Sequence, residues 1–151
     1  MTTTIEGIDG LKVRVGEHLG YSDWRTVTQE QINLFAEATG DFQWIHVDIE
    51  RANAGPFGGP IAHGYLTLSL LPTMLHEIWD VSGTAMGINY GLNKLRYPAP
   101  VPVGSKLRAG VTLAGVEDVA GGAQATLAVT FEIEGGAKPV CVAEVLFRYY
   151  V

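Results

Sequence analysis

The segment TGDFQWIH, residues 39–46, brings two ionisable side chains close together among bulky apolar neighbours. Four residues separate Asp41 from His46. An acid and an imidazole that converge on one water molecule can perform general acid–base chemistry near neutral pH, because the pKa of free imidazole is about 6.5. This spacing does not place both side chains on one helix face, so a bent loop must aim them at one point. The alternative is that Asp41 is a turn residue at a helix end and His46 is a buried structural histidine.

A second segment, IAHGYL at residues 61–66, leads from a Gly- and Pro-rich loop into an apolar stretch. The backbone N–H groups in the first turn of a helix have no intrahelical partner and carry partial positive charge. Because Gly64 has no side chain, a carbonyl oxygen that becomes negative can approach these groups, as in an oxyanion hole. The alternative is that Gly64 only allows tight packing. Together, the two segments predict a site that polarises a carbonyl group and moves protons beside it.

The acid follows a helix whose two ends are marked by sequence. Residues 28–39 are predicted to be helical, with a capping box formed by Thr28 and Gln31 at the start. Gly40 fits the position just past the helix end, where a positive φ is favoured. A short helical turn is expected at residues 48–54.

A second helix is predicted at residues 64–79, directly after the glycine of the second segment. Its apolar residues cover nearly every side, and such a helix is expected to be wrapped by other elements. Pro72 has no N–H group for the helical hydrogen bonds, so it is expected to kink this helix.

The second half of the chain has the period-two alternation of half-buried strands. Strands are predicted at residues 86–97, 105–116, 123–133 and 141–149, with turns at Gly121-Gly122 and Gly135-Gly136, and the N-terminal segment is expected to add another strand. A long helix followed by long antiparallel strands indicates an α+β fold in which a curved sheet wraps the helix. Such strands leave an exposed edge, and pairing in a homodimer is one way to cover it.

Composition limits the classes of partner. The chain has 151 residues, of which 47% are hydrophobic and 17% charged, so a single domain over residues 1–151 is expected. A formal net charge of −6 argues against nucleic acid or an anionic membrane surface as a partner. The longest apolar run, residues 65–75, is too short and too mixed to span a bilayer. The first residues lack the pattern of a secretory signal, and the lone Cys141 cannot form an internal disulfide, so a cytoplasmic protein is expected.

The motifs resemble those of the MaoC-like, or (R)-specific, enoyl-CoA hydratases, which have the hot-dog fold. The family signature runs as a small residue, Gly-Asp, any residue, Asn-Pro, an aliphatic residue and His, then five residues and a small one. Residues 39–46 are similar to it, with Ala52 at the final position. The segments PIAHG at residues 60–64 and PVPVG at residues 100–104 are also similar to family motifs. The resemblance covers most of the chain and is greatest to the nodulation protein N-like subgroup.

The chain departs from the family pattern at three positions. Gln43 and Trp44 stand where the family has Asn-Pro, which changes the stiffness of the loop but keeps both ionisable residues. Pro72 stands where some members have a serine that supports the site, and Ser69 lies one turn away from it.

The resemblance implies a hydro-lyase that adds water to a trans-2-enoyl thioester. Asp41 and His46 would hold the water, and the N–H group of Gly64 would bind the thioester carbonyl. The product would be the (R)-3-hydroxyacyl thioester, carried on coenzyme A or an acyl-carrier protein, with no metal or redox cofactor. Two alternatives stay open, namely a hot-dog acyl-thioester hydrolase and a non-catalytic acyl-thioester-binding protein.

Two further groups of residues are expected to bind the substrate. The apolar residues of the first segment, Phe42, Trp44 and Ile45, are expected to form the acyl pocket. Asn89 and Tyr90, on a strand that faces the central helix, are expected to line an acyl tunnel.

Remaining ionisable residues have weaker functional interpretations. His63 is expected to anchor the loop by a hydrogen bond rather than to contact substrate. Four cationic residues on two strands predicted to be neighbours are the candidates for a basic patch that meets coenzyme A phosphates: Lys94, Arg96, Lys106 and Arg108.

Overall fold

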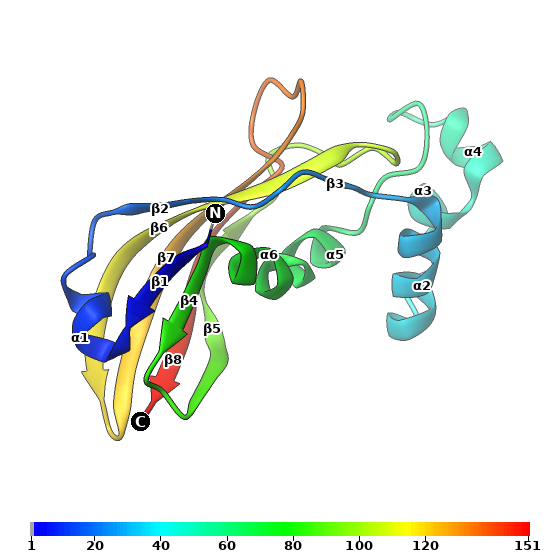
Figure 1. Cartoon of the computed structure of the whole chain (residues 1–151). Helices are drawn as coiled ribbons and strands as arrows, with labels where there is room; N and C mark the ends of the chain where they lie inside the picture. Colours follow the sequence, from blue (N-terminus) through cyan, green and yellow to red (C-terminus); the bar gives the residue numbers. More distant parts are fainter. Residues whose placement is uncertain (1) are drawn as a thin grey trace.

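Long antiparallel strands form a curved sheet, and two short consecutive helices lie against one of its faces (Figure 1). The structure is a computed structural model that describes residues 2–151. Its elements, in chain order, are β1 (Thr3–Glu6), α1 (Gly7–Lys12), β2 (His18–Tyr21), β3 (Arg25–Thr26), α2 (Gln29–Thr39), α3 (Trp44–Val47), α4 (Ile49–Asn53), α5 (Gly64–Ser69), α6 (Leu71–Ile78), β4 (Trp79–Ser82), β5 (Met86–Arg96), β6 (Lys106–Val119), β7 (Gly122–Ile133) and β8 (Cys141–Tyr150).

The main sheet has the order β2-β6-β7-β8-β5, and β3 also pairs with β6. All of these pairs are antiparallel, and β6, β7 and β8 are joined by hairpins through Gly121 and Gly135, both with positive φ. Alternate residues of these strands are buried, which confirms the strands and turns predicted from the period-two pattern. The inner face of the sheet carries most of the hydrophobic core, including Leu107, Leu127 and Phe131.

The predicted central helix is interrupted. It consists of α5 and α6, separated at Leu70, and Pro72 lies in the first turn of α6. Proline is tolerated in a first turn because the N–H group there has no intrahelical partner. Ending one helix and starting another therefore accommodates Pro72 without a broken hydrogen bond inside a helix.

The central helices are also not wrapped on every side within one chain. Leu66, Met74 and Ile78 are buried against the sheet, whereas Tyr65 is 67% exposed and His76 is also exposed. The expectation of burial all round is wrong because one side of these helices, which carries Tyr65 and His76, is not covered by other elements of residues 2–151.

The N-terminal segment contributes more than the one strand expected. Strand β1 pairs in parallel with β4 in a separate two-stranded sheet, in which Thr3 is opposite Trp79. Strands β2 and β3 extend the main sheet beside β6. Among residues 2–151, no helix is long and apolar enough to cross a membrane.

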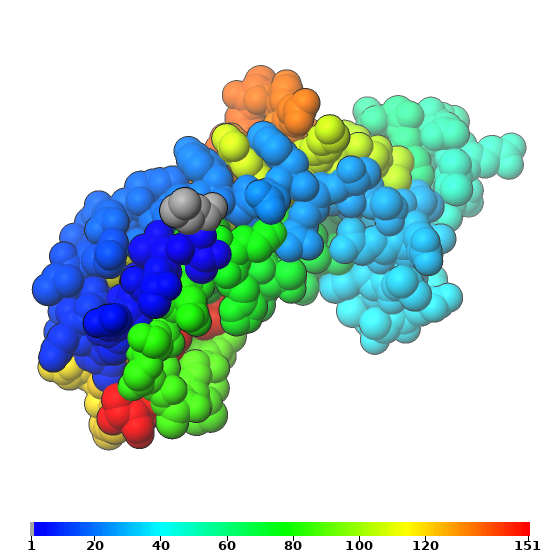
Figure 2. Space-filling view, in the orientation of Figure 1, coloured from blue at the N-terminus to red at the C-terminus, as the bar shows by residue number. Residues whose placement is uncertain are grey.

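Helices α2, α3 and α4 form a lobe on the side of the molecule where α5 begins (Figures 1 and 2). The hydroxyl of Thr28 accepts a hydrogen bond of 3.1 Å from the N–H of Gln31, so α2 begins as predicted. Gly40 adopts a left-handed conformation with φ of 80° and ends the helix. This turn sends the chain toward α5 and positions the loop that carries Asp41.

Candidate active site

Asp41 lies in the loop that follows α2, with its side chain exposed. Its Oδ1 accepts a hydrogen bond of 3.3 Å from the N–H of Gln43, and its own N–H donates to the Thr39 hydroxyl at 3.4 Å. These local bonds form a turn of the kind that aspartate favours. The carboxylate keeps its remaining lone pairs free to accept other hydrogen bonds.

His46 lies in α3 and is buried, with only 6% of its surface exposed. Its Nδ1 is 2.6 Å from the carbonyl oxygen of Ile61. A carbonyl oxygen can only accept, so Nδ1 carries the proton and Nε2 holds the lone pair of the neutral ring. The N–H of Ile61 donates in turn to the carbonyl of Ile45 at 3.0 Å, which fastens α3 to the segment before α5. His46 is therefore held in the tautomer that a general base requires.

Burial lowers the pKa of His46 below its ordinary value of 6.5. The carbonyl of Ile61 acts in the opposite direction, and the neighbouring His63 lowers this pKa further, while Asp41 raises it. Removal from water is the largest of these effects because it disfavours the charged imidazolium. The ring is accordingly neutral and able to accept a proton at neutral pH.

His63 connects the acid to the base. It is 2% exposed, and its Nε2 donates a hydrogen bond of 2.9 Å to the backbone carbonyl of Asp41, which is the anchoring bond expected from sequence. Its ring stacks on the His46 ring with a centroid distance of 3.9 Å, and Phe35 packs at 4.8 Å. His63 also directly precedes Gly64 in the chain. This residue therefore contacts the Asp41 loop and the His46 ring and lies at the start of α5.

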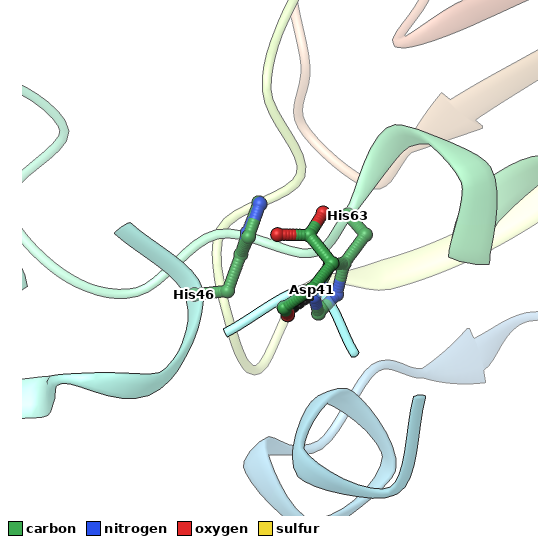
Figure 3. Close-up of side chains that lie close together, drawn as sticks. All are labelled: Asp41, His46 and His63. Carbon is green, nitrogen blue, oxygen red and sulfur yellow. Dashed lines mark hydrogen bonds between the residues drawn. The ribbon is translucent and has the colours of Figure 1, made fainter. Parts of the chain in front are cut away.

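Figure 3 shows the three side chains gathered where the Asp41 loop, α3 and the start of α5 meet. One ligand-capable atom from each lies within 4.8 Å of the others. However, the two imidazole rings are only 24° from parallel, so their in-plane lone pairs do not converge on one point as metal coordination requires. The arrangement suits a water held by hydrogen bonds better than a metal ion.

A cavity of about 330 Å³ opens beside this cluster. Its wall is mostly apolar, and its polar groups come from His46, the backbone at Gly64, Thr67 and Tyr97. The complete lining is His46, Phe57, Ile61, Ala62, Gly64, Thr67, Tyr97, Pro98, Ala99, Pro100, Val101 and Val140. An apolar cavity with few polar groups at one end has the character of a small-molecule site.

Gly64 is the first residue of α5 and lines the cavity. No side chain caps this helix start, so the first N–H groups keep their hydrogen-bonding capacity. A Cβ atom at this position would lie 2.8 Å from the ring of Tyr97. Both interpretations of the glycine therefore apply: it allows Tyr97 to pack closely, and it leaves the backbone N–H accessible.

The structure does not bring Asn89 and Tyr90 to this cavity. Adjacent residues of a strand point to opposite faces, so the two cannot both face the central helices. Asn89 lines a second cavity of about 360 Å³ beside α6 and β4. Tyr90 is 52% exposed on the other face, where the guanidinium of Arg148 lies 3.5 Å from its ring centroid.

The apolar residues of the first segment do not line this cavity either. Phe42 is 58% exposed, and neither it nor Trp44 lines the cavity. Trp44 packs beneath the guanidinium of Arg51, 4.2 Å from the ring centroid. A large part of the cavity wall is formed instead by residues 97–101. Their local sequence does not indicate this role, because only the folding of the chain brings them next to α5.

The predicted basic patch is not formed as expected, because β5 and β6 are not neighbours. Strands β7 and β8 lie between them, which separates Lys94 and Arg96 from the cationic residues of β6. Arg108 is further occupied by an ion pair of 2.6 Å with Glu132 and by packing over the ring of Tyr21.

The comparisons with known proteins agree with this geometry. A family model described as MaoC like domain matches residues 11–133. The 3-hydroxyacyl-thioester dehydratase Z of Mycobacterium tuberculosis (strain ATCC 25618 / H37Rv) is 59% identical over 147 residues, which cover 97% of this chain and 97% of that protein. Nodulation protein N of Rhizobium leguminosarum bv. viciae is 46% identical over 135 residues, covering 86% and 83%.

A solved structure of an (R)-hydratase from A. caviae superposes with a TM-score of 0.73 and 26% identity, covering 88% of this chain and 94% of that one. The chain therefore belongs to the MaoC-like dehydratase family and is a hydro-lyase with the hot-dog fold. The family, its nodulation protein N-like relatives and the fold predicted from the motifs are confirmed.

Proposed function

We propose that this enzyme hydrates trans-2-enoyl thioesters of coenzyme A or an acyl-carrier protein to (R)-3-hydroxyacyl thioesters, and catalyses the reverse dehydration. The observation that carries this proposal is the pairing of a neutral, buried His46 with the Asp41 carboxylate beside an apolar cavity. Similarity to a 3-hydroxyacyl-thioester dehydratase and to an (R)-hydratase supports the substrate class.

The proposed reaction uses one water molecule held between Asp41 and His46. His46 Nε2 takes a proton from this water as its oxygen bonds to Cβ of the substrate. The π electrons of the broken double bond move toward Cα and the carbonyl, and the Asp41–His46 pair returns one proton to Cα. In our assignment Asp41 orients the water, receives this proton from the His46 imidazolium and delivers it to Cα. Both groups then end in their starting protonation states.

The carbonyl oxygen of the thioester becomes more negative as the new C–O bond forms. In the proposal this oxygen accepts a hydrogen bond from the N–H of Gly64 at the start of α5. A fixed donor aimed at developing charge stabilises the transition state by roughly 3–4 kcal/mol in measured cases. The scheme requires no metal or redox cofactor, so activity is expected to survive dialysis against a chelator.

Product analysis distinguishes this proposal from its alternatives. We expect crotonyl-CoA to be converted to 3-hydroxybutyryl-CoA of R configuration, as resolved by chiral chromatography after hydrolysis. Release of free thiol, detected with a thiol-reactive dye, would indicate an acyl-thioester hydrolase instead. Tight binding of crotonyl-CoA with no product would favour a non-catalytic binding protein.

We also propose that the enzyme is a homodimer that pairs through β5. This strand is at the end of the main sheet, and its outer backbone groups have no strand partner within residues 2–151. Its side chains are largely exposed, including Met86, Tyr90 and Leu92. A long edge strand of this kind is a template for pairing with another chain. Light scattering is expected to give about twice the chain mass of 16.2 kDa, and a mass of one chain would refute the dimer.

A further inference from the structure

The hydroxyl group of Thr67 is buried without a hydrogen-bond partner. The residue is 1% exposed, and its Oγ1 contacts no donor or acceptor of the chain. Buried hydroxyls are nearly always hydrogen-bonded, because removal from water without a partner is unfavourable. A threonine within a helix commonly donates to the carbonyl four residues earlier, but Thr67 makes no such bond to His63. The hydroxyl thus has a hydrogen-bonding capacity that no group among residues 2–151 uses, in a residue that lines the cavity.

Thr67 differs from the other buried polar groups that lack a partner among residues 2–151. Arg25 Nε and Glu77 Oε2 belong to two side chains already joined by an ion pair of 2.6 Å. The remaining group, His63 Nδ1, is buried but does not line the cavity. Thr67 alone among these four residues forms part of the cavity wall.

The position of Thr67 on α5 directs its side chain toward the helix start. It lies three residues after Gly64, and residues with this spacing share one helix face. Side chains in a helix tilt toward the N-terminus, so the Thr67 side chain covers the turn that begins at Gly64. Both residues line the same cavity, so the hydroxyl and the Gly64 N–H lie on neighbouring parts of its wall.

We propose that the Thr67 hydroxyl is a second hydrogen-bond donor to the carbonyl oxygen of the acyl thioester, beside the N–H of Gly64. This inference rests on the proposed function and names a further substrate-binding residue for it. Two donors hold the carbonyl in one orientation and stabilise the negative charge that develops on it. The burial of an unpaired hydroxyl is then a property of the free enzyme that substrate binding relieves.

Three variants test the proposal. Thr67→Val keeps the shape of the side chain without the hydroxyl, and Thr67→Ser keeps the hydroxyl. Ser69→Ala is the matched control, because it removes an exposed hydroxyl of α5 that is bonded to the Tyr65 carbonyl at 2.6 Å. We expect kcat/KM for crotonyl-CoA to fall about 10- to 100-fold in Thr67→Val, chiefly through kcat, to fall much less in Thr67→Ser, which keeps the donor, and to stay near the wild-type value in Ser69→Ala.

Stability separates a substrate contact from a structural role. Because the hydroxyl has no partner in the free enzyme, Thr67→Val is expected to unfold at the same or a higher temperature than wild type. Unchanged kcat/KM in Thr67→Val would overturn the proposal. A lower unfolding temperature together with a displaced pH profile would also overturn it, since the hydroxyl would then serve the neighbouring His63.

A spectroscopic measurement keeps this test separate from the proposed function. The carbonyl stretching frequency of bound butyryl-CoA, labelled with 13C, reports hydrogen bonding without any turnover. We expect a lower frequency on wild type and Thr67→Ser than on Thr67→Val. Equal frequencies would refute the role of Thr67, whereas inactive wild-type enzyme with a frequency difference would refute only the hydratase assignment.

Discussion

The imidazole of His63 donates a hydrogen bond from Nε2 to the backbone carbonyl of Asp41 at 2.9 Å, while its ring stacks on His46. The bond fixes the loop that carries the acid, and the stacking fixes the plane of the base. Because Asp41 lies in the loop after α2 and His46 lies in α3, the two contacts of His63 hold the separation of the catalytic candidates constant.

Substitution of His63 is expected to damage the relative placement of the pair. His63→Phe keeps a stacking ring but removes the donor, and His63→Gln keeps a donor but removes the ring. We expect both to lower kcat by about 10- to 100-fold with a smaller change in KM, because misplacement affects the chemical step. Denaturant unfolding should show a loss of about 1 kcal/mol in His63→Phe, the size of one hydrogen bond. A wild-type kcat in both variants would contradict this positioning role.

The lowered pKa of His46 predicts how activity depends on pH. The neutral ring is the base, so kcat/KM is expected to stay high as pH falls and to decline only below the ordinary histidine value of 6.5. In His63→Phe the acidic limb should move to higher pH, because His63 contributes to lowering this pKa. A limb at or above 6.5 in wild type would show that His46 is not the base or is not desolvated.

The same group makes stability depend on pH. In the window between the lowered folded pKa and the unfolded value of about 6.5, the unfolded chain binds a proton at His46 and the folded chain does not. The free energy of unfolding therefore rises with pH through this window. The stabilisation that the neutral His46 contributes reaches its full value above about pH 6.5. Urea unfolding at pH 5 and pH 7.5 should show this difference in wild type and a smaller one in His46→Gln.

Gly64→Ala is expected to lower both stability and activity, because its methyl group would clash with the Tyr97 ring. The new Cβ would lie 2.8 Å from the Tyr97 ring, so the ring or the start of α5 must move, at a cost of about 1–3 kcal/mol in unfolding free energy. Activity should fall at the same time, because the displaced helix start no longer aims its N–H at the substrate. The double variant Gly64→Ala/Tyr97→Leu should recover stability. Recovery of activity as well would show that the glycine serves packing, since alanine keeps the N–H group.

The contribution of the α2 N-cap to stability can be tested without changing a candidate catalytic residue. Thr28→Ala removes the hydroxyl that accepts from the N–H of Gln31 and is expected to cost about 1 kcal/mol of unfolding free energy. The matched control is Thr26→Ala, an exposed threonine two residues earlier in β3. Equal stability of the two variants would show that this cap does not support α2.

Features that depend on local chemistry could be predicted from the sequence. Thr28 and Gly40 mark the ends of α2 because capping and positive φ are properties of single residues in their immediate surroundings. The long strands follow from alternation, which also reports a local environment. The Asp41 and His46 pair was identifiable because the residues of the motif are close in sequence.

Features that depend on contacts between distant segments were not predictable in the same way. The parallel pairing of β1 with β4 joins Thr3 to Trp79, and no local pattern indicates it. The cavity wall combines Val101 and Val140 with α5, and only the closed fold shows that they meet. Asn89 and Tyr90 are neighbours in sequence, but only the folded sheet shows that Asn89 lines the second cavity whereas Tyr90 packs against Arg148.

In the proposed mechanism, Asp41 and His46 together activate water for addition to an enoyl thioester. The most direct test follows the loss of enoyl-thioester absorbance with crotonyl-CoA for wild type, Asp41→Asn and His46→Gln, with circular dichroism to verify folding. We expect hydration by wild type and a loss of at least about 100-fold in kcat for each folded variant. Wild-type rates in either variant, or no hydration of short and medium enoyl-CoAs by wild type, would contradict it.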